Sequence, residues 1–311
     1  MEPRRVIDLL KRNGTDLLHL FLVPILIALL PWKLAFRLLK RMARQGYADG
    51  PGVERAWQAA RPHLPKQDGE DWKSRFRLLQ LVERVDTWLV LLRPARWWSR
   101  QIDQTGTWPA HAGPFVLLTF HWGGGQWIWR QLHQAGIPAH FLARRPQAAD
   151  LGAGRLAIWF ARVREFGIFR QGGCAVIFTG GSSARIHEAL QHRRSVVGML
   201  DLPATTTQTI LRRPLLDGEV AIPFGLLRVA AAANAKVLMF SCSLDVDSGR
   251  RRLQILDVPA HADVPALASA YVEHLDRCLR SESAFWQVWS SAPMMFVQNR
   301  ADADAEEVAP D

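Results

Sequence analysis

The sequence is poor in cysteine and tyrosine. It contains three cysteines, Cys174, Cys242 and Cys278, and only two tyrosines among its 311 residues. An odd number of widely spaced cysteines provides neither a disulfide framework nor a metal site. Each cysteine lies in or beside an apolar run. We therefore interpret all three as small buried side chains in a reducing, cytoplasmic setting.

The N-terminal apolar run is too short for an ordinary transmembrane helix, which needs about 20 apolar residues. This run, LLHLFLVPILIALLP at 17–31, is followed directly by the basic amphipathic stretch WKLAFRLLKRMAR. Apolar residues interleaved with Lys and Arg in this way are typical of a helix lying in a membrane interface. No small-residue cleavage site follows, which argues against a secretory signal peptide. We predict that residues 1–46 form membrane-associated helices that insert into or barely span the membrane, the alternative being a buried helix of the globular domain.

Acidic residues are fewer than basic ones, 29 against 39, so the formal net charge is +10. This charge favours an anionic partner such as nucleic acid, an anionic membrane, or an acidic protein or substrate. The sequence has no zinc-knuckle spacing and no aromatic-rich RNP-like strand, so we expect no nucleic acid. Tryptophan interleaved with Lys and Arg is typical of a membrane interface instead. The tryptophans concerned are Trp32, Trp72, Trp88, Trp97 and Trp98.

From residue 114 onward, apolar runs alternate with amphipathic stretches. Predicted strands lie at 115–120, 140–143, 175–179, 195–200, 220–223, 236–243 and 253–258. Predicted helices lie at 71–92, 126–135, 154–166, 183–192, 226–233, 265–280 and 284–289. This alternation predicts an α/β domain at 47–300, with a mixed central sheet flanked by helices. The acidic segment 301–311 is predicted to be a disordered tail.

The stretch TFHWGGGQWIWR follows one of these strands and places a histidine where the strand ends. Ligands of open α/β sheets bind beyond the carboxyl ends of the strands, which is the place of His121. Gly123, Gly124 and Gly125 let the backbone approach a ligand and offer amide groups to an oxyanion. An imidazole there would take a proton from an acceptor hydroxyl as it attacks a thioester. The alternative is a core or capping histidine.

These residues resemble the H-x4-D/E motif of the bacterial lipid A biosynthesis acyltransferases, the lauroyl/myristoyl transferase family. In that motif an apolar strand, a histidine and a glycine-containing turn precede a carboxylate. Further segments resemble the family in the same order. They are HFLARR at 140–145, TGGSSAR at 179–185, VVGMLD at 196–201 and VAIPFG at 220–225. The resemblance extends from about residue 17 to residue 289.

The resemblance implies a glycerolipid-acyltransferase-like fold and an enzyme on the cytoplasmic face of the inner membrane. Such an enzyme moves a fatty acyl group from acyl carrier protein or CoA to a hydroxyl or amine of a lipid or glycolipid. It implies no metal and no cofactor beyond the acyl thioester, with His121 as the general base. Arg144 and Asp201, each following a predicted strand, are further substrate-binding candidates. The positive charge independently suits acyl carrier protein, CoA and anionic lipids.

The chain departs from the family pattern at Gln126, where the motif has Asp or Glu. An amide oxygen still accepts a hydrogen bond from an imidazole, but it cannot stabilise the imidazolium. In serine proteases the equivalent Asp-to-Asn change costs about 10⁴ in rate. We therefore predict Gln126 to be a weakened orienting partner of His121. Three interpretations stay open: Asp201 rebuilds the dyad, the enzyme acts slowly on an easy acceptor, or a degenerate relative binds acyl chains or acyl carrier protein without turnover.

A serine hydrolase is the rival enzyme class. Residues 174–184 imitate the strand, turn and helix of a hydrolase nucleophile elbow, with Ser182 as the nucleophile. Asp201 and His261 follow in the order of a hydrolase triad. However, Ala184 stands where the motif requires glycine, and only about 80 residues separate Ser182 from His261.

Overall fold

A seven-stranded mixed sheet forms the centre of the protein. The computed structural model describes residues 13–47, 50–110, 113–145, 155–204, 210–258 and 262–297. The strand order is β1-β9-β8-β2-β5-β3-β4, in which only β8 and β9 pair antiparallel. The strands are β1 (Ile102–Thr105), β2 (Phe115–Thr119), β3 (Ala139–Ala143), β4 (Ile177–Phe178), β5 (Ser195–Met199), β8 (Lys236–Leu244) and β9 (Arg251–Asp257). The predicted α/β class with a mixed central sheet is confirmed.

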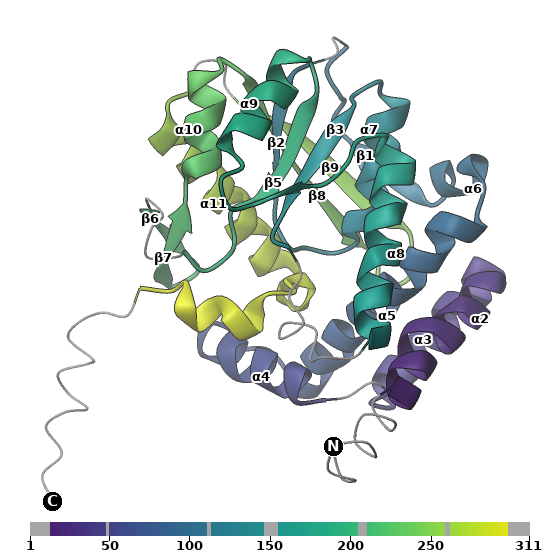
Figure 1. Ribbon diagram of the computed structural model, residues 1–311. Coiled ribbons are helices and arrows are strands. Elements are labelled where there is room, and N and C mark those ends of the chain that lie inside the picture. Colours follow the sequence, from purple (N-terminus) through teal and green to yellow (C-terminus); the bar gives the residue numbers. More distant parts are fainter. Residues whose placement is uncertain are drawn as a thin grey trace, which may run out of the picture.

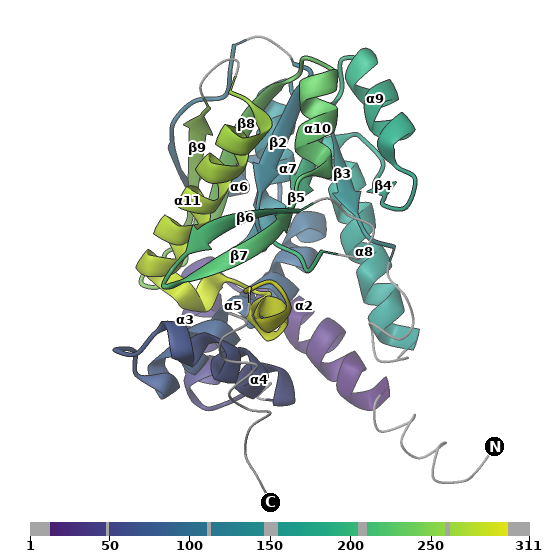
Figure 2. The ribbon, with the colours of Figure 1, turned by 90° about the vertical axis from the view of Figure 1, so that its left-hand side faces the viewer.

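Helices cover both faces of the sheet and one of its ends. The helices are η1 (Leu17–Leu22), α2 (Val23–Leu29), α3 (Trp32–Arg44), α4 (Pro51–Ala60), η2 (Arg61–His63), α5 (Gly69–Leu92), α6 (Ala95–Ser99), η3 (Gly125–Trp127), α7 (Ile128–Gln134), α8 (Arg155–Gly172), α9 (Ser183–Gln191), α10 (Gly225–Ala232), α11 (Val264–Glu282), η4 (Ser283–Phe285) and η5 (Trp289–Met294). Helices α10 and α11 lie in front of the sheet and α7 lies behind it in Figure 2. The N-terminal helices α2 to α5 lie below the sheet in Figures 1 and 2.

The hydrophobic pattern explains which strands were foreseen. The first four residues of β2 are all buried, so this central parallel strand appears in the sequence as a continuous apolar run. The exposed edge strand β1, with the sequence IDQT, carries no such run and was not predicted. The strand at 220–223 was predicted as one more strand of the α/β pattern. It is the second strand of a separate antiparallel hairpin, β6 (Ile210–Leu215) and β7 (Gly218–Pro223).

The N-terminal helices pack against the α/β domain and share its core. The Trp32 indole nitrogen of α3 donates to the carbonyl of Gly249, between β8 and β9, at 3.1 Å. Within the helical layer, the Trp88 indole nitrogen donates to the carbonyl of Leu20 at 2.8 Å, and the Arg93 guanidinium donates to the carbonyls of Ala28 and Leu30 at 2.7 Å each. No helix in the described ranges is long and apolar enough to cross a membrane. The expected anchor helix is therefore not found there: η1 and α2 run on from each other, but the helical backbone ends at Leu30, which is extended and precedes Pro31.

The tryptophans assigned above to a membrane interface are mostly core residues. Trp32, Trp72 and Trp98 are buried, and Trp88 and Trp97 are half-buried. On α3 the apolar positions Trp32, Phe36 and Leu39 face the protein rather than lipid, at the helical spacing of a core-facing stripe. Interleaving with Lys and Arg did not distinguish a core tryptophan from an interfacial one, because both lie on amphipathic helices.

Candidate active site

Two adjacent parallel strands place His121 beside Asp201. Strands β2 and β5 pair in a register that sets Thr119 opposite Met199, and each chain leaves its strand there. Two residues beyond this pair, the chain reaches His121 after β2 and Asp201 after β5. The two side chains therefore emerge at the same carboxyl edge of the sheet, where α/β proteins bind ligands. This edge faces the N-terminal helical layer (Figure 1).

The Asp201 carboxylate is fully buried and holds the histidine at two atoms. His121 Nδ1 lies 3.1 Å from Asp201 Oδ1, and the His121 backbone amide donates to Asp201 Oδ2 at 2.7 Å. The indole nitrogen of Trp286 donates to the same Oδ2 at 2.8 Å. Tyr271 lies on the other side of the carboxylate, with its hydroxyl 3.3 Å from Oδ1. These contacts fix the position of the Asp201 carboxylate so that it orients the imidazole.

The bond to Asp201 fixes the chemistry of the ring. An Nδ1–H that donates to the carboxylate leaves the lone pair on Nε2, which has no hydrogen-bond partner in the described ranges. Burial lowers the pKa of His121, but the Asp201 charge and its hydrogen bond outweigh burial, so the pKa is raised above its ordinary value. His121 is thus a strengthened base with an open nitrogen.

The glycine turn is used differently from the prediction. The amide of Gly123 donates to the carbonyl of Phe285 at 3.1 Å, and the amide of Gly124 donates to the carbonyl of Cys242 at 2.9 Å. These amides tie the turn to the protein and do not serve an oxyanion. Gly123 has a φ of 57°, and a Cβ there would lie 2.1 Å from the Cys242 carbonyl oxygen, so glycine is required. The exposed amide of Gly125 makes no hydrogen bond to the described part of the chain.

Gln126 does not take the role predicted for it. Its side chain is buried in η3, and its amide nitrogen has no hydrogen-bond partner among the described residues, the His121 imidazole included. The predicted orienting bond is replaced by the bond to Asp201, because β5 delivers that carboxylate to Nδ1. Gln126 lies instead against α8, where a Cβ on Gly167 would be 3.7 Å from its Oε1.

An apolar cavity of about 110 Å³ opens beside the His121 ring. His121, Gly125 and Gln126 line it, as do the polar residues Glu83, Arg164 and Gln287, and the rest of its wall is largely apolar. The apolar wall residues include Phe120, Ile128, Trp129, Phe141, Ile168 and Met199. Burial raises the pKa of the Cys242 thiol, which also lines the cavity, to about 12. That cysteine therefore stays protonated and is no nucleophile.

Helix α5 supplies a buried carboxylate that the sequence analysis did not single out. Glu83 lines the cavity, and its Oε2 accepts from the half-exposed Arg164 of α8 at 2.9 Å. Its Oε1 is buried without a partner among the described residues. Burial raises the pKa of Glu83; Arg164 opposes this and Asp86 adds to it. The sequence carried one signal for this site: Glu83 and Asp86 both fall on the apolar face of the predicted helix 71–92.

A buried ion pair joins the N-terminal helices to the turn behind the site. Arg251 of β9 donates to Asp86 of α5 at 2.6 Å, and both side chains are fully buried. The Trp127 indole donates to the same Asp86 carboxylate at 2.8 Å. The guanidinium also lies over the rings of Trp32 and Trp127, at 5.1 and 4.6 Å from their centres. This cluster fixes η3, and with it Gln126, relative to α3 and α5.

Two further predicted residues, Arg144 and Ser182, do not line the cavity. Arg144 is exposed after β3, at the same edge of the sheet as His121, but it does not line the cavity. Ser182 precedes α9, which follows the edge strand β4, whereas the Asp201 that a hydrolase triad needs is bonded to His121. His261 falls outside the described residues, so the proposed triad partner has no described position.

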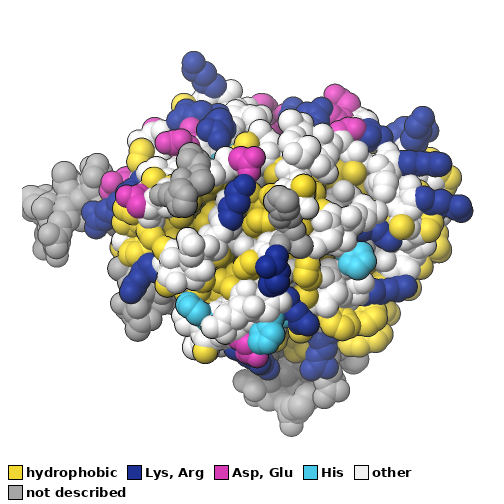
Figure 3. Space-filling view, turned by 90° about the horizontal axis from the view of Figure 1, so that it is seen from above, with side chains coloured by type: hydrophobic (Ala, Val, Ile, Leu, Met, Phe, Trp, Pro, Cys, Tyr) yellow, Lys and Arg dark blue, Asp and Glu magenta, His cyan; other side chains and the backbone are white. Residues whose placement is uncertain are grey.

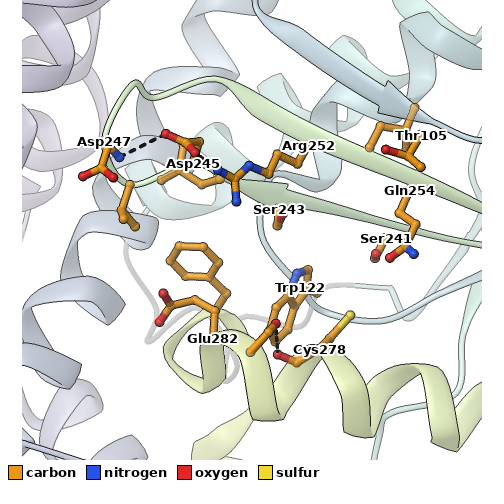
Figure 4. Close-up of a pocket in the computed structure, with 15 residues that line it drawn as sticks. Thr105, Trp122, Ser241, Ser243, Asp245, Asp247, Arg252, Gln254, Cys278 and Glu282 are labelled. Atoms are coloured by element: carbon orange, nitrogen blue, oxygen red, sulfur yellow. Dashed lines mark hydrogen bonds and ion pairs between the residues drawn. The ribbon is translucent and has the colours of Figure 1, made fainter.

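A larger pocket, of about 400 Å³, lies on the other face of β8. Ser241 and Ser243 line it, whereas the alternate residues Phe240 and Cys242 face the apolar cavity. Figure 4 shows Asp245 on the strand side and Glu282 on the helix side. Asp245 holds the turn by accepting from the amides of Asp247 and Ser248, and Glu282 pairs with Arg75 at 2.6 Å. The Asp245 and Glu282 carboxylates of this pocket therefore hold a turn and an ion pair together. We place the candidate active site at His121 instead.

Comparison of the sequence with protein-family models and with curated proteins finds no match.

Proposed function

We propose that this protein is a membrane-associated acyltransferase. It moves a fatty acyl group from a thioester of acyl carrier protein or CoA to a hydroxyl, or amine, of a lipid or glycolipid. The observation that carries the proposal is the His121 imidazole, bonded to the buried Asp201 carboxylate, at the wall of an apolar cavity. A base, an orienting acid and an adjacent apolar cavity are what acyl transfer between lipidic substrates requires.

The proposed step uses the open nitrogen of His121. The acceptor O–H donates to Nε2 and loses its proton to it while the oxygen attacks the thioester carbonyl carbon. Asp201 stabilises the imidazolium that forms. When the tetrahedral intermediate collapses, the C–S bond breaks and the imidazolium returns the proton to the leaving thiolate. The products are an ester and a free thiol, with no acyl-enzyme between them.

An exposed apolar surface beside the cavity supports a membrane location. The exposed residues of η1 and α2 recur at helical spacing and thus share one face; they are Leu18, Leu22, Leu26 and Leu29. Helix α8 adds three more, Trp159, Phe166 and Phe169. Stacking of Phe21 on Trp159, with ring centres 5.5 Å apart, places the two helices together. We call these seven residues the apolar strip. Large exposed apolar patches mark membrane or protein contact sites.

Helix α8 connects the apolar strip to the cavity. Ile168 and Arg164 line the cavity, whereas the neighbouring Phe166 and Phe169 are exposed in the strip. An acyl chain or lipid acceptor leaving the bilayer would therefore reach His121 along one helix. Lys and Arg side chains, with fewer acidic ones among them, are also spread over the face shown in Figure 3, which is the end of the molecule away from the N-terminal helices. The formal net charge of +10 attracts anionic lipids and an acidic carrier to the molecule as a whole.

The alternative, a degenerate relative without catalytic activity, was based on Gln126. With glutamine at that position, the motif provides no carboxylate partner for His121. The buried Asp201 supplies that carboxylate from a neighbouring strand, at 3.1 Å. This favours the catalytic proposal.

Acyl transfer in detergent micelles tests the proposal. The donor is acyl carrier protein loaded with a mixture of chain lengths, and a native lipid extract serves as the acceptor. Mass spectrometry identifies any lipid that gains an acyl group. We expect one class of acylated product with the wild type and none with His121→Ala. Equal product with both proteins would contradict the proposal, and Ser182→Ala would then be the next variant.

A further inference from the structure

We propose that the side-chain amide of Gln126 is a catalytic residue, the hydrogen-bond donor that stabilises the oxyanion of the tetrahedral intermediate. This inference rests on the proposed acyl-transfer function and adds a residue to it. It also gives the glutamine at the position of the family carboxylate a role that a carboxylate could not fill, because an ionised carboxylate has no proton to donate.

An oxyanion donor is needed at this site, and the turn offers few. Acyl transfer passes through a negatively charged oxygen that enzymes stabilise with pre-placed N–H groups. The amides of Gly123 and Gly124, the obvious candidates, are consumed by the carbonyls of Phe285 and Cys242. The amide of Gly125 makes no such bond and also lines the cavity, and a side-chain donor in the same cavity wall would act beside it.

Gln126 has a donor that nothing in the described ranges uses. Its side chain is 3 % exposed, it lines the same cavity as His121, and its Nε2 has no hydrogen-bond partner there. A buried amide donor without a partner destabilises the folded protein. Such a cost is retained where a ligand supplies the missing acceptor, and the acceptor that this reaction brings is the thioester carbonyl oxygen.

The position of the base fixes where this oxygen lies. The attacking oxygen must be within hydrogen-bond reach of His121 Nε2, and the carbonyl carbon within about 3–3.5 Å of that oxygen. The carbonyl group must therefore sit in the cavity beside His121, and Gly125 and Gln126 also line this cavity. As the acceptor oxygen attacks, the C=O electrons move to the carbonyl oxygen, and the Gln126 N–H stabilises that charge until the C–S bond breaks.

Glu83 makes a carboxylate at position 126 unfavourable. Its Oε1 is also buried without a partner and lines the same cavity. A Gln126→Glu change would add a second acid to a small apolar space, where like charges repel strongly. If Gln126 only oriented His121, this same change would restore the family motif and speed the reaction. The two roles thus predict opposite effects for one substitution.

The experiment compares Gln126→Met, Gln126→Glu and Gln171→Met with the wild type in the acyl-transfer assay. Gln171 is a matched control, a buried glutamine of α8 whose amide atoms also lack partners but which does not line the cavity. Each protein is also tested with an inhibitor, an S-alkyl thioether of the same carrier protein. The thioether has the chain and the sulfur but no carbonyl oxygen.

We expect kcat to fall by about 10²–10³ in Gln126→Met, the usual effect of removing one oxyanion donor. Binding of the thioether should stay within about twofold of the wild type, and Gln171→Met should keep near-normal kcat. Gln126→Glu should also be slower than the wild type. Three results would each overturn the inference. They are an unchanged kcat in Gln126→Met, a loss of thioether binding in Gln126→Met as large as its loss of kcat, and a Gln126→Glu variant faster than the wild type. Wild-type protein without any transfer, or activity retained in His121→Ala, would overturn the proposed function as well.

Discussion

His121 is held by Asp201 through both its backbone amide and its ring nitrogen. The amide reaches Oδ2 at 2.7 Å and Nδ1 lies 3.1 Å from Oδ1, so one buried carboxylate sets the backbone and the ring together. Gln126, the partner expected from the sequence, is five positions along the chain from His121. Asp201, which bonds to the imidazole, is 80 positions away. A short motif in the sequence is thus completed by a neighbouring strand.

The pH dependence of the reaction should report the pKa of His121. The imidazole acts as a base only when it is unprotonated, so kcat/KM should rise with pH through that pKa. Because Asp201 raises the pKa of His121 above the 6.5 of a free imidazole, we expect the inflection above pH 6.5. In Asp201→Asn, burial remains and lowers the pKa, so the residual activity should have its inflection at lower pH. A pH–rate profile of both proteins measures this, and an inflection unchanged in Asp201→Asn would speak against the assignment.

Narrowing the cavity should shorten the acyl chain that is transferred. Ile168→Trp places a larger ring in the cavity wall on α8, and overpacking of this kind excludes longer chains. Competition between acyl carrier proteins of different chain length measures the change. Phe169→Trp, at the exposed neighbouring position, is the matched control and should leave chain preference unchanged. The same preference in both variants would mean that the chain binds elsewhere.

Charges placed in the apolar strip should release the protein from membranes. Leu26 and Leu29 are 63 % and 59 % exposed, so Leu26→Glu with Leu29→Glu should not disturb the core. We expect at least about tenfold weaker binding to vesicles with anionic lipids, because two carboxylates would have to enter the interface. Activity on short, water-soluble substrates should be unaffected. Met294→Glu, at an exposed apolar side chain outside the strip, is the control in vesicle sedimentation, and equal binding by all three proteins would refute this membrane face.

The buried ion pair behind the site should be important for stability. Asp86→Ala would leave the Arg251 charge buried without its carboxylate, at a cost of about 3–5 kcal/mol in the free energy of unfolding. Asp103→Ala, which breaks an exposed pair with Arg250, should have little effect. Urea unfolding of the two variants measures the difference. Similar midpoints for both would show that the cluster of Asp86, Arg251 and Trp127 does not hold the turn.

Much of the fold could be predicted from the sequence because its central strands are buried on both faces. Such strands, β2 and β5 among them, appear as continuous apolar runs and were placed to within a residue or two. The polar edge strand β1 had no such signal. The stretch 32–44 was assigned to a membrane interface for a related reason: an apolar face looks the same in the sequence whether it packs on lipid or on protein, and Trp32, Phe36 and Leu39 pack on the protein.

The site was harder to predict because its parts come together only through the sheet and the helical layer. His121 was visible as a titratable residue at a strand end, and Asp201 as an acid directly after another predicted strand. Their shared edge depends on the β2–β5 pairing, which no local pattern records. Glu83 and Arg164 lie on different helices and are 81 positions apart in the sequence, so no local pattern predicts their ion pair. That the Gln126 amide nitrogen has no partner among the described residues depends on how η3 packs against α8, which no local pattern predicts.

The most direct test of the account is the transfer rate of Asp201→Asn beside those of the wild type and His121→Ala. The substitution keeps the shape of the side chain but removes the charge that stabilises the imidazolium. We predict a loss of about 10³–10⁴ in kcat for Asp201→Asn, close to that of His121→Ala, with thermal unfolding followed to verify that the protein is folded. Folded Asp201→Asn with wild-type kcat would contradict the central claim, because the proposed base would then work without its carboxylate.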